Sequence, residues 1–88
     1  MESRTAIVGS AVGLHARPAA VFVKAVADSG HRVTIAKPGS EPVDAASILS
    51  VMGLGAACGD TVELAVEGPD AASVLAHLAA LVESDLDA

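Results

Sequence analysis

The most constraining feature of this chain is residues 60–67, where large apolar side chains recur at every second position. Val62, Leu64 and Val66 would face one side of a strand, and the polar residues Thr61, Glu63 and Glu67 would face the other. Such a strand needs a layer that covers its apolar side only. The helix predicted to begin at Pro69-Asp70 supplies one, because its apolar residues form a single stripe: Ala71, Val74, Leu75, Leu78, Leu81 and Val82.

Other stretches show either the alternation typical of a strand or the spacing typical of a helix, and they predict the remaining elements. These are strands at 5–9, 32–37 and 41–44, a helix at 16–29 that stops at Gly30, and a short helix at 47–53. The predicted order is therefore β-α-β-β-α-β-α, within a single domain over residues 1–88. Helices grouped on one side of a sheet give an α+β fold. We expect an open-faced two-layer β-sandwich, with a four-stranded, mainly antiparallel sheet covered on one face by three helices.

Composition limits which residues can form the core and in which compartment the protein is expected. Hydrophobic residues make up 52% of 88 residues, with one Phe and neither Trp nor Tyr, so the core must be built from Val, Leu, Ile and Ala. Charged residues interrupt every apolar run, and the N-terminus lacks a basic start followed by an apolar segment, which argues against a membrane span and against secretion. The single Cys58 excludes an internal disulfide and a cysteine-based zinc site. We expect a cytoplasmic protein that is a monomer, with no metal and no cofactor.

The distribution of charge points to the kind of partner. The net charge of -6 argues against a nucleic-acid binder. All five basic residues lie within the first 37 positions. A local positive patch on an acidic protein suits a small anion or an acidic partner surface.

The stretch around His15 carries the chemistry. His15 falls just before a predicted helix whose first turn holds Ala16, Arg17 and Pro18. The backbone N–H groups of Ala16 and Arg17 and the positive helix end would lie near the imidazole, which disfavours an imidazolium and can hold a tetrahedral anion. Arg17 would add a fork of donors. Two interpretations stay open on position alone: a capping or surface histidine, and an imidazole that accepts a phosphoryl group.

Two motifs carry a family resemblance. The sequence GLHARPAA at residues 13–20 resembles the active-site signature of HPr, the histidine-containing phosphocarrier family of the bacterial phosphoenolpyruvate:sugar phosphotransferase system. The sequence SILSVMGLG at residues 47–55 is similar to the second signature of that family. The length and the predicted element order fit as well, so the resemblance covers essentially the whole chain.

The resemblance implies a phosphocarrier rather than an enzyme with a small-molecule substrate. In that family, enzyme I passes a phosphoryl group to Nδ1 of the histidine matching His15, and the carrier delivers it to the IIA domains of sugar permeases. The arginine matching Arg17 assists at the phosphate.

The second motif carries two further hypotheses. Ser47 is a good N-cap for the short helix, whereas in some relatives the matching serine is phosphorylated by a regulatory kinase and then favours a transcription-factor partner. Those relatives commonly have a lysine where this chain has Ala46.

Residues beside that serine are candidates for partner docking. Ile48, Leu49 and Met52 match an apolar contact surface of the family, although helical spacing also allows Ile48 and Met52 to be buried. Leu49 lies off that stripe and is expected to be exposed. Lys24 shares the outer face of its helix with Arg17, where it could steer an acidic partner or simply be solvated.

Two other classes of function remain open. One is a regulatory binding module of the same fold that acts through its apolar surface, with a switch at Ser47; relatives specialised in this way lack the histidine. Another is a small enzyme that uses His15 and Arg17 on a phosphate or acyl-phosphate substrate. His31, His77 and Cys58 show no metal-ligand spacing and no paired base, and we assign them no chemistry.

Overall fold

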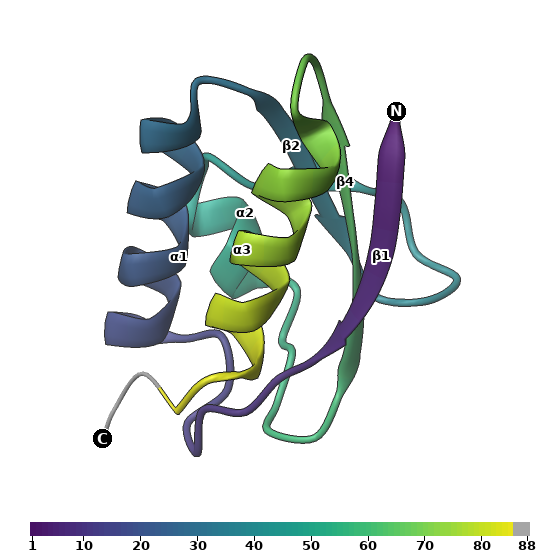
Figure 1. Cartoon of the computed structure of the whole chain (residues 1–88). Coiled ribbons are helices and arrows are strands. Elements are labelled where there is room, and N and C mark those ends of the chain that lie inside the picture. Colours follow the sequence, from purple (N-terminus) through teal and green to yellow (C-terminus); the bar gives the residue numbers. More distant parts are fainter. Residues whose placement is uncertain (86–88) are drawn as a thin grey trace.

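The computed structural model describes residues 1–85 and has the predicted order of elements (Figure 1). The elements are β1 (Glu2–Ile7), α1 (Ala16–Ser29), β2 (Arg32–Ala36), β3 (Val43–Asp44), α2 (Ile48–Gly53), β4 (Thr61–Glu67) and α3 (Ala71–Glu83). The four strands form one sheet in the order β1-β4-β2-β3, and each neighbouring pair is antiparallel. The three helices lie on one side of this sheet, which confirms the predicted α+β, open-faced arrangement (Figure 1).

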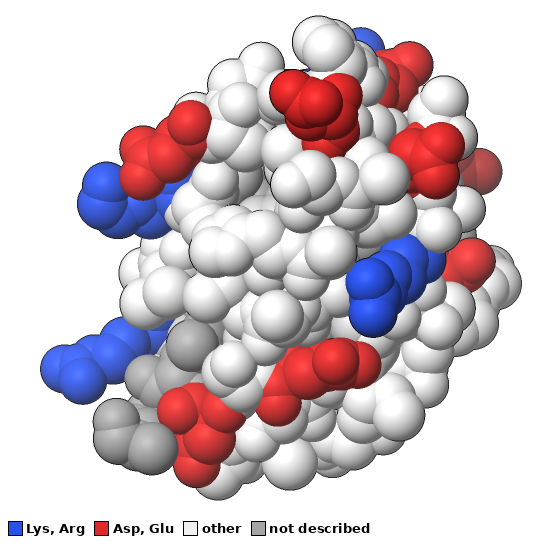
Figure 2. Space-filling view, in the orientation of Figure 1, with Lys and Arg blue, Asp and Glu red and all other residues white. Residues whose placement is uncertain are grey.

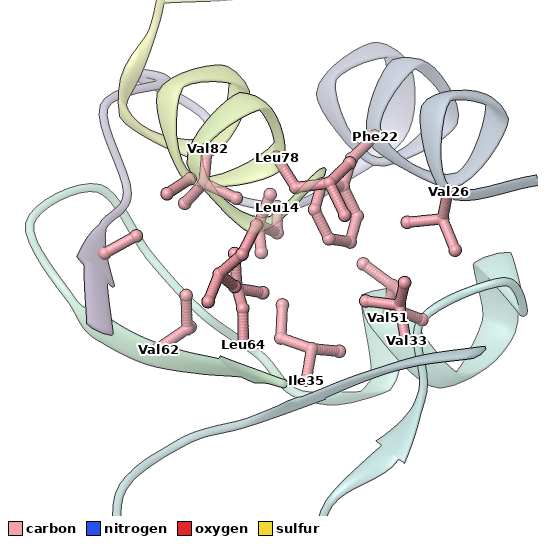
Figure 3. Close-up of a cluster of buried hydrophobic side chains, with 14 of the residues drawn as sticks. Leu14, Phe22, Val26, Val33, Ile35, Val51, Val62, Leu64, Leu78 and Val82 are labelled. Atoms are coloured by element: carbon pink, nitrogen blue, oxygen red, sulfur yellow. The ribbon is translucent and has the colours of Figure 1, made fainter. Parts of the chain in front are cut away.

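The core lies between the sheet and the helices. Val62, Leu64 and Val66 of β4 are fully buried, whereas the residues between them on this strand are exposed or half-buried, as the alternation predicts. Figure 3 shows Phe22 of α1 and Leu78 of α3 pointing into the cluster that the sheet residues form from below. The two layers therefore pack against each other through a core of Val, Leu, Ile and Ala with one aromatic ring.

Strand β1 differs from the sequence prediction. It spans Glu2–Ile7 rather than 5–9, because its backbone pairs with β4 from Glu2 opposite Val66 to Ile7 opposite Thr61. Backbone pairing along an existing strand does not need β-prone side chains, so the polar residues at the start of β1 join the sheet.

Strand β3 is also shorter than predicted. It contains Val43–Asp44 only, and Pro42 stands just before it. A proline has no N–H to donate to the strand ladder, which ends the pairing there.

The ends of helix α1 follow the sequence. The helix spans Ala16–Ser29 as predicted, and Gly30 closes it in the left-handed region at φ 70°. Glycine adopts this conformation without the steric penalty of a Cβ atom. Pro18 is buried in the first turn, where the absence of its N–H costs no helical hydrogen bond. None of the helices within residues 1–85 is long and apolar enough to cross a membrane.

Candidate phosphoryl-acceptor site

His15 occupies the N-cap position of α1 without capping it. Its backbone is extended, at φ -142° and ψ 156°, and its side chain makes no capping hydrogen bond. The residue is exposed, and its imidazole has no hydrogen bond or ion pair with any part of residues 1–85. Both ring nitrogens are therefore open to a group brought by another molecule.

The backbone after His15 is strained. Ala16 has φ 49°, in the left-handed region that a residue with a Cβ atom adopts only at a cost. The first helical hydrogen bond of this end runs from the N–H of Ala19 to the carbonyl of His15 at 3.5 Å. The N–H groups of Ala16 and Arg17 precede it and have no acceptor four residues earlier inside the helix, and Pro18 has no N–H. Two amides next to His15 are thus available to an anion.

The basic residues differ in whether an acidic side chain pairs with them. On the face that Figure 2 shows, the blue side chains stand in separate groups, and one of those at the left adjoins a red side chain. Within the described residues, three of them form ion pairs: Lys24 with Asp28 at 3.2 Å, Arg32 with Glu67 at 3.6 Å, and Lys37 with Asp60 at 3.8 Å. Arg17, beside His15 in the chain, is exposed and has no ion-pair partner within residues 1–85. It is the cation that the sequence predicts for the site, and it remains available.

Helix α2 presents its second residue to solvent. Leu49 is 81% exposed and Ile48 is 39% exposed, whereas Val51 is fully buried. Met52 is half-buried and packs against the core. Leu49 is therefore the exposed apolar residue that the sequence predicts, Ile48 is partly so, and Met52 serves the core.

Ser47 caps α2. Its side-chain oxygen accepts a hydrogen bond from the backbone N–H of Ser50 at 3.3 Å. This confirms the capping role predicted for Ser47.

Two of the exposed apolar residues without a role assigned from the sequence lie just before α1 or on it. Val12 is 56% exposed in the loop before His15, and Val21 is 37% exposed on α1. Helix α1, which carries Val21, packs against α2, which carries Leu49. The sequence indicates them only by an apolar residue in a predicted loop, at Val12, and by another on the outer face of the predicted helix, at Val21.

His31 lies away from His15, in the turn between α1 and β2. Its Nδ1 contacts the carbonyl oxygen of Ser29 at 2.7 Å, and its Nε2 contacts that of Pro69, in the turn before α3. The hydrogen bond to Pro69 raises the pKa of His31, and the one to Ser29 and the charge of Asp70 add to this rise against a smaller opposing effect of burial. His31 therefore links two turns and has a structural role that the sequence did not indicate.

The remaining candidates stay without chemistry. His77 and Cys58 are exposed, and the thiol is free. Within residues 1–85, no three side chains of His, Cys, Asp or Glu gather closely enough to hold a metal ion.

Comparison with known proteins identifies the family. A family model described as the PTS HPr component phosphorylation site matches residues 2–84. The chain belongs to the HPr family. Phosphocarrier protein HPr of Streptomyces coelicolor is 48% identical over 87 residues, which cover 99% of this chain and 94% of that protein. The crystal structure of HPr from Bacillus anthracis matches with a TM-score of 0.86 and 36% identity, over 92% of this chain and 95% of that one.

HPr proteins are phosphocarriers of the phosphotransferase system, and this chain is a phosphoryl carrier rather than an enzyme. Membership implies partners within that system. The HPr-like protein Crh of Bacillus subtilis is also similar, at 38% identity over 84% of this chain and 86% of that protein.

Proposed function

We propose that His15 is the residue of this phosphocarrier that receives the phosphoryl group from phosphorylated enzyme I and passes it to the IIA domains of sugar permeases. The observation that carries the proposal is the exposed imidazole at the start of α1, which makes no hydrogen bond or ion pair within residues 1–85. A ring whose nitrogens are not bonded within the described residues can bind the phosphoryl group brought by one partner protein and pass it to the next.

The transfer is a displacement at phosphorus. A lone pair on a ring nitrogen of neutral His15, which is Nδ1 in the family, attacks the phosphorus atom, and the bond from phosphorus to the donor nitrogen of enzyme I breaks. The reverse roles apply when an acceptor group in a IIA domain attacks. No electrons are lost or gained, and the bond to nitrogen keeps a high transfer potential, which suits a relay.

Three groups would stabilise the phosphoryl oxygens. The N–H groups of Ala16 and Arg17 have no acceptor inside the helix, and the positive end of the helix dipole adds to their effect. The Arg17 guanidinium is unpaired within the described residues and would bind two oxygens at once. Together they bind an anion best when its charge is largest, in the transferring phosphoryl group.

The docking surface would combine apolar and positive side chains. Leu49 and Ile48 supply the exposed apolar part, with Met52 beside them and half-buried. Lys24 is 77% exposed, and because its ion pair with Asp28 is also exposed, a partner carboxylate can replace Asp28 at little cost.

We also assign the chain, over residues 1–88, to one domain that works as a monomer in the cytoplasm. The family match over residues 2–84 supports the single domain. The exposed, unpaired thiol of Cys58 fits a reducing compartment.

The test is intact-mass spectrometry after incubation with phosphoenolpyruvate and purified enzyme I. We expect one added phosphoryl group that is acid-labile, alkali-stable, absent in His15→Ala and present in His77→Ala, which removes another exposed histidine. Retained phosphorylation of His15→Ala, or none of the unmodified chain by an enzyme I that is active on another carrier, contradicts the proposal. Transfer from the purified phosphorylated protein to a IIA domain tests the second half of the relay.

The similarity to Crh supports one alternative, a regulatory module that binds a kinase or transcription factor through the Leu49 surface with a switch at Ser47. The hydroxyl of Ser47 already serves as the cap of α2, so a phosphate there would change the acceptor at that helix end. Binding of a regulatory partner by His15→Ala, together with no phosphoryl acceptance by the unmodified chain, would favour this alternative.

A further inference from the structure

A tight turn at residues 57–60 is closed by the side chain of Asp60. Its Oδ2 accepts a hydrogen bond from the backbone N–H of Ala57 at 2.9 Å, and its own N–H donates to the carbonyl of Ala57 at 2.9 Å. The same carboxylate faces Lys37 Nζ at 3.8 Å. Two reciprocal bonds between the same pair of residues leave this turn little freedom.

The residue before the turn is in direct contact with the segment that carries His15. The carbonyl of Ala56 accepts a hydrogen bond from the backbone N–H of Leu14 at 2.9 Å. Ala56 and Leu14 are both buried, at 5% and 2% exposure. Because Leu14 is bonded directly to His15 in the chain, the position of Ala56 sets where the backbone of His15 begins.

Gly13 shows how close the two segments lie. A Cβ atom on Gly13 would stand 2.4 Å from the carbonyl oxygen of Ala56 and 3.0 Å from the Cα of Ala57. The φ of Gly13 is also 76°, which disfavours any other residue. At Gly13, the His15 segment and the start of the Asp60 turn are therefore packed too closely to admit an added Cβ atom.

The far side of the turn is fixed to the same segment. The N–H of Val8 donates to the carbonyl of Asp60 at 2.9 Å, and the N–H of Gly59 donates to the carbonyl of Val8 at 2.8 Å. Residues 8–14 are therefore held against the turn at both of their ends, and the turn in between is closed by the Asp60 carboxylate.

We propose that Asp60 is a positioning residue for phosphoryl transfer: it holds the turn at 57–60 in the shape that places Ala56, and through Ala56 and Leu14 it fixes the backbone from which His15 projects. This inference rests on the proposed role of His15. Asp60 does not touch the phosphoryl group. Its effect arises because a displacement at phosphorus requires the attacking nitrogen to be held in line, and a small misplacement lowers the rate steeply.

The test compares three variants by the rate constant of phosphoryl acceptance from phosphorylated enzyme I in a single turnover. Asp60→Ala removes the acceptor for the Ala57 N–H and should lower the rate constant about fivefold or more. Asp60→Asn keeps a side-chain oxygen in the same place, loses the charge, and should stay within about twofold of the unmodified protein. Glu63→Ala removes an equal charge from an exposed position of β4 and should leave the rate unchanged.

Hydrogen exchange at the Leu14 amide separates positioning from general loss of stability. We expect exchange at Leu14 to quicken in Asp60→Ala and not in Asp60→Asn, while amides of β4 keep their protection. Unchanged acceptance by Asp60→Ala overturns the proposal, and so does an equal loss of rate in Asp60→Asn, which would assign the effect to charge.

Gly13→Ala tests the same contact from the other side and does not depend on Asp60→Ala folding. It should give slower acceptance together with faster exchange at Leu14. Faster exchange with normal acceptance would show that this contact does not position His15. Failure of the proposed function is seen separately, because an unmodified chain that accepts no phosphoryl group on His15 contradicts that role whatever the variants do.

Discussion

His15 and Ser47 both occupy N-cap positions, but only Ser47 caps its helix. The Ser47 oxygen accepts a hydrogen bond from the N–H of Ser50, whereas the His15 imidazole accepts none from α1. Serine is among the best N-cap residues, and histidine is not. The N-cap position of α2 therefore holds a residue that stabilises the helix end, whereas the N-cap position of α1 holds a side chain that makes no capping bond. This difference agrees with the role proposed for His15.

The two caps should differ when each is replaced by alanine. Ser47→Ala should lower the free energy of unfolding by about 1 kcal/mol, because the N–H of Ser50 loses its acceptor. His15→Ala should change it by less than about 0.5 kcal/mol, since the exposed side chain has no hydrogen bond or ion pair within residues 1–85 to lose. Urea unfolding of both variants decides this, and a larger loss for His15→Ala than for Ser47→Ala would mean that His15 has a structural role.

Arg17→Ala should slow phosphoryl transfer without destabilising the fold. The guanidinium has no ion pair within residues 1–85, so its removal costs the free protein little, whereas the transferring phosphoryl group loses a charged donor. We expect the rate constant of acceptance to fall about tenfold. Arg32→Ala, which removes an exposed cation elsewhere, is the matched control, and equal kinetics for the two variants would remove Arg17 from the site.

Leu49→Glu should weaken binding to enzyme I. Leu49 is 81% exposed, so the substitution is tolerated in the free protein, but docking would then bury an unpaired carboxylate. Titration calorimetry should show affinity reduced about tenfold or more. Ile7→Glu makes the same change at a 55% exposed position on β1 and should bind normally. Normal binding by Leu49→Glu would place the docking surface elsewhere.

His31 should make stability depend on pH. Its ring nitrogens face the carbonyls of Pro69 and Ser29, and only the protonated ring can donate to both, which raises its pKa in the folded protein. A folded-state pKa above the unfolded value, about 6.5, gives stability that is complete below that value and is lost as the pH rises through the folded pKa.

Denaturant midpoints measured between about pH 5.5 and 8.5 check this, since that range spans the unfolded value of the histidine pKa. The fall with rising pH should be smaller in His31→Gln and unchanged in His77→Gln, which alters a histidine exposed on α3. If His31→Gln keeps the whole pH dependence, the two carbonyl contacts do not stabilise the protonated ring.

Local sequence patterns were sufficient to predict the elements that position the candidate site. The bounds of α1 follow from its apolar period with Pro18 at one end and Gly30 at the other, and β4 follows from its alternation. The cap at Ser47 and the exposure of Leu49 also follow from their places on α2. In each case a residue and its neighbours within one turn determine the outcome.

Contacts between distant segments were not predictable in this way. The start of β1 at Glu2 depends on pairing with β4, and the ring of His31 meets Pro69, 38 residues further along the chain. The bond from Leu14 to Ala56 likewise joins two loops that carry no common pattern. The ion pairs of Lys24, Arg32 and Lys37 depend on the fold as well, so the sequence did not show which basic side chains stay unpaired.

The chain has three histidines, and ¹⁵N NMR of their imidazole rings tests the central claim most directly. Spectra recorded before and after phosphorylation by enzyme I and phosphoenolpyruvate should show one ring, that of His15, with the shift and the phosphorus coupling of a nitrogen–phosphorus bond. The rings of His31 and His77 should keep their unphosphorylated signals. Phosphorus coupling at either of those rings, or at none while the intact mass shows an added phosphoryl group, would contradict the account.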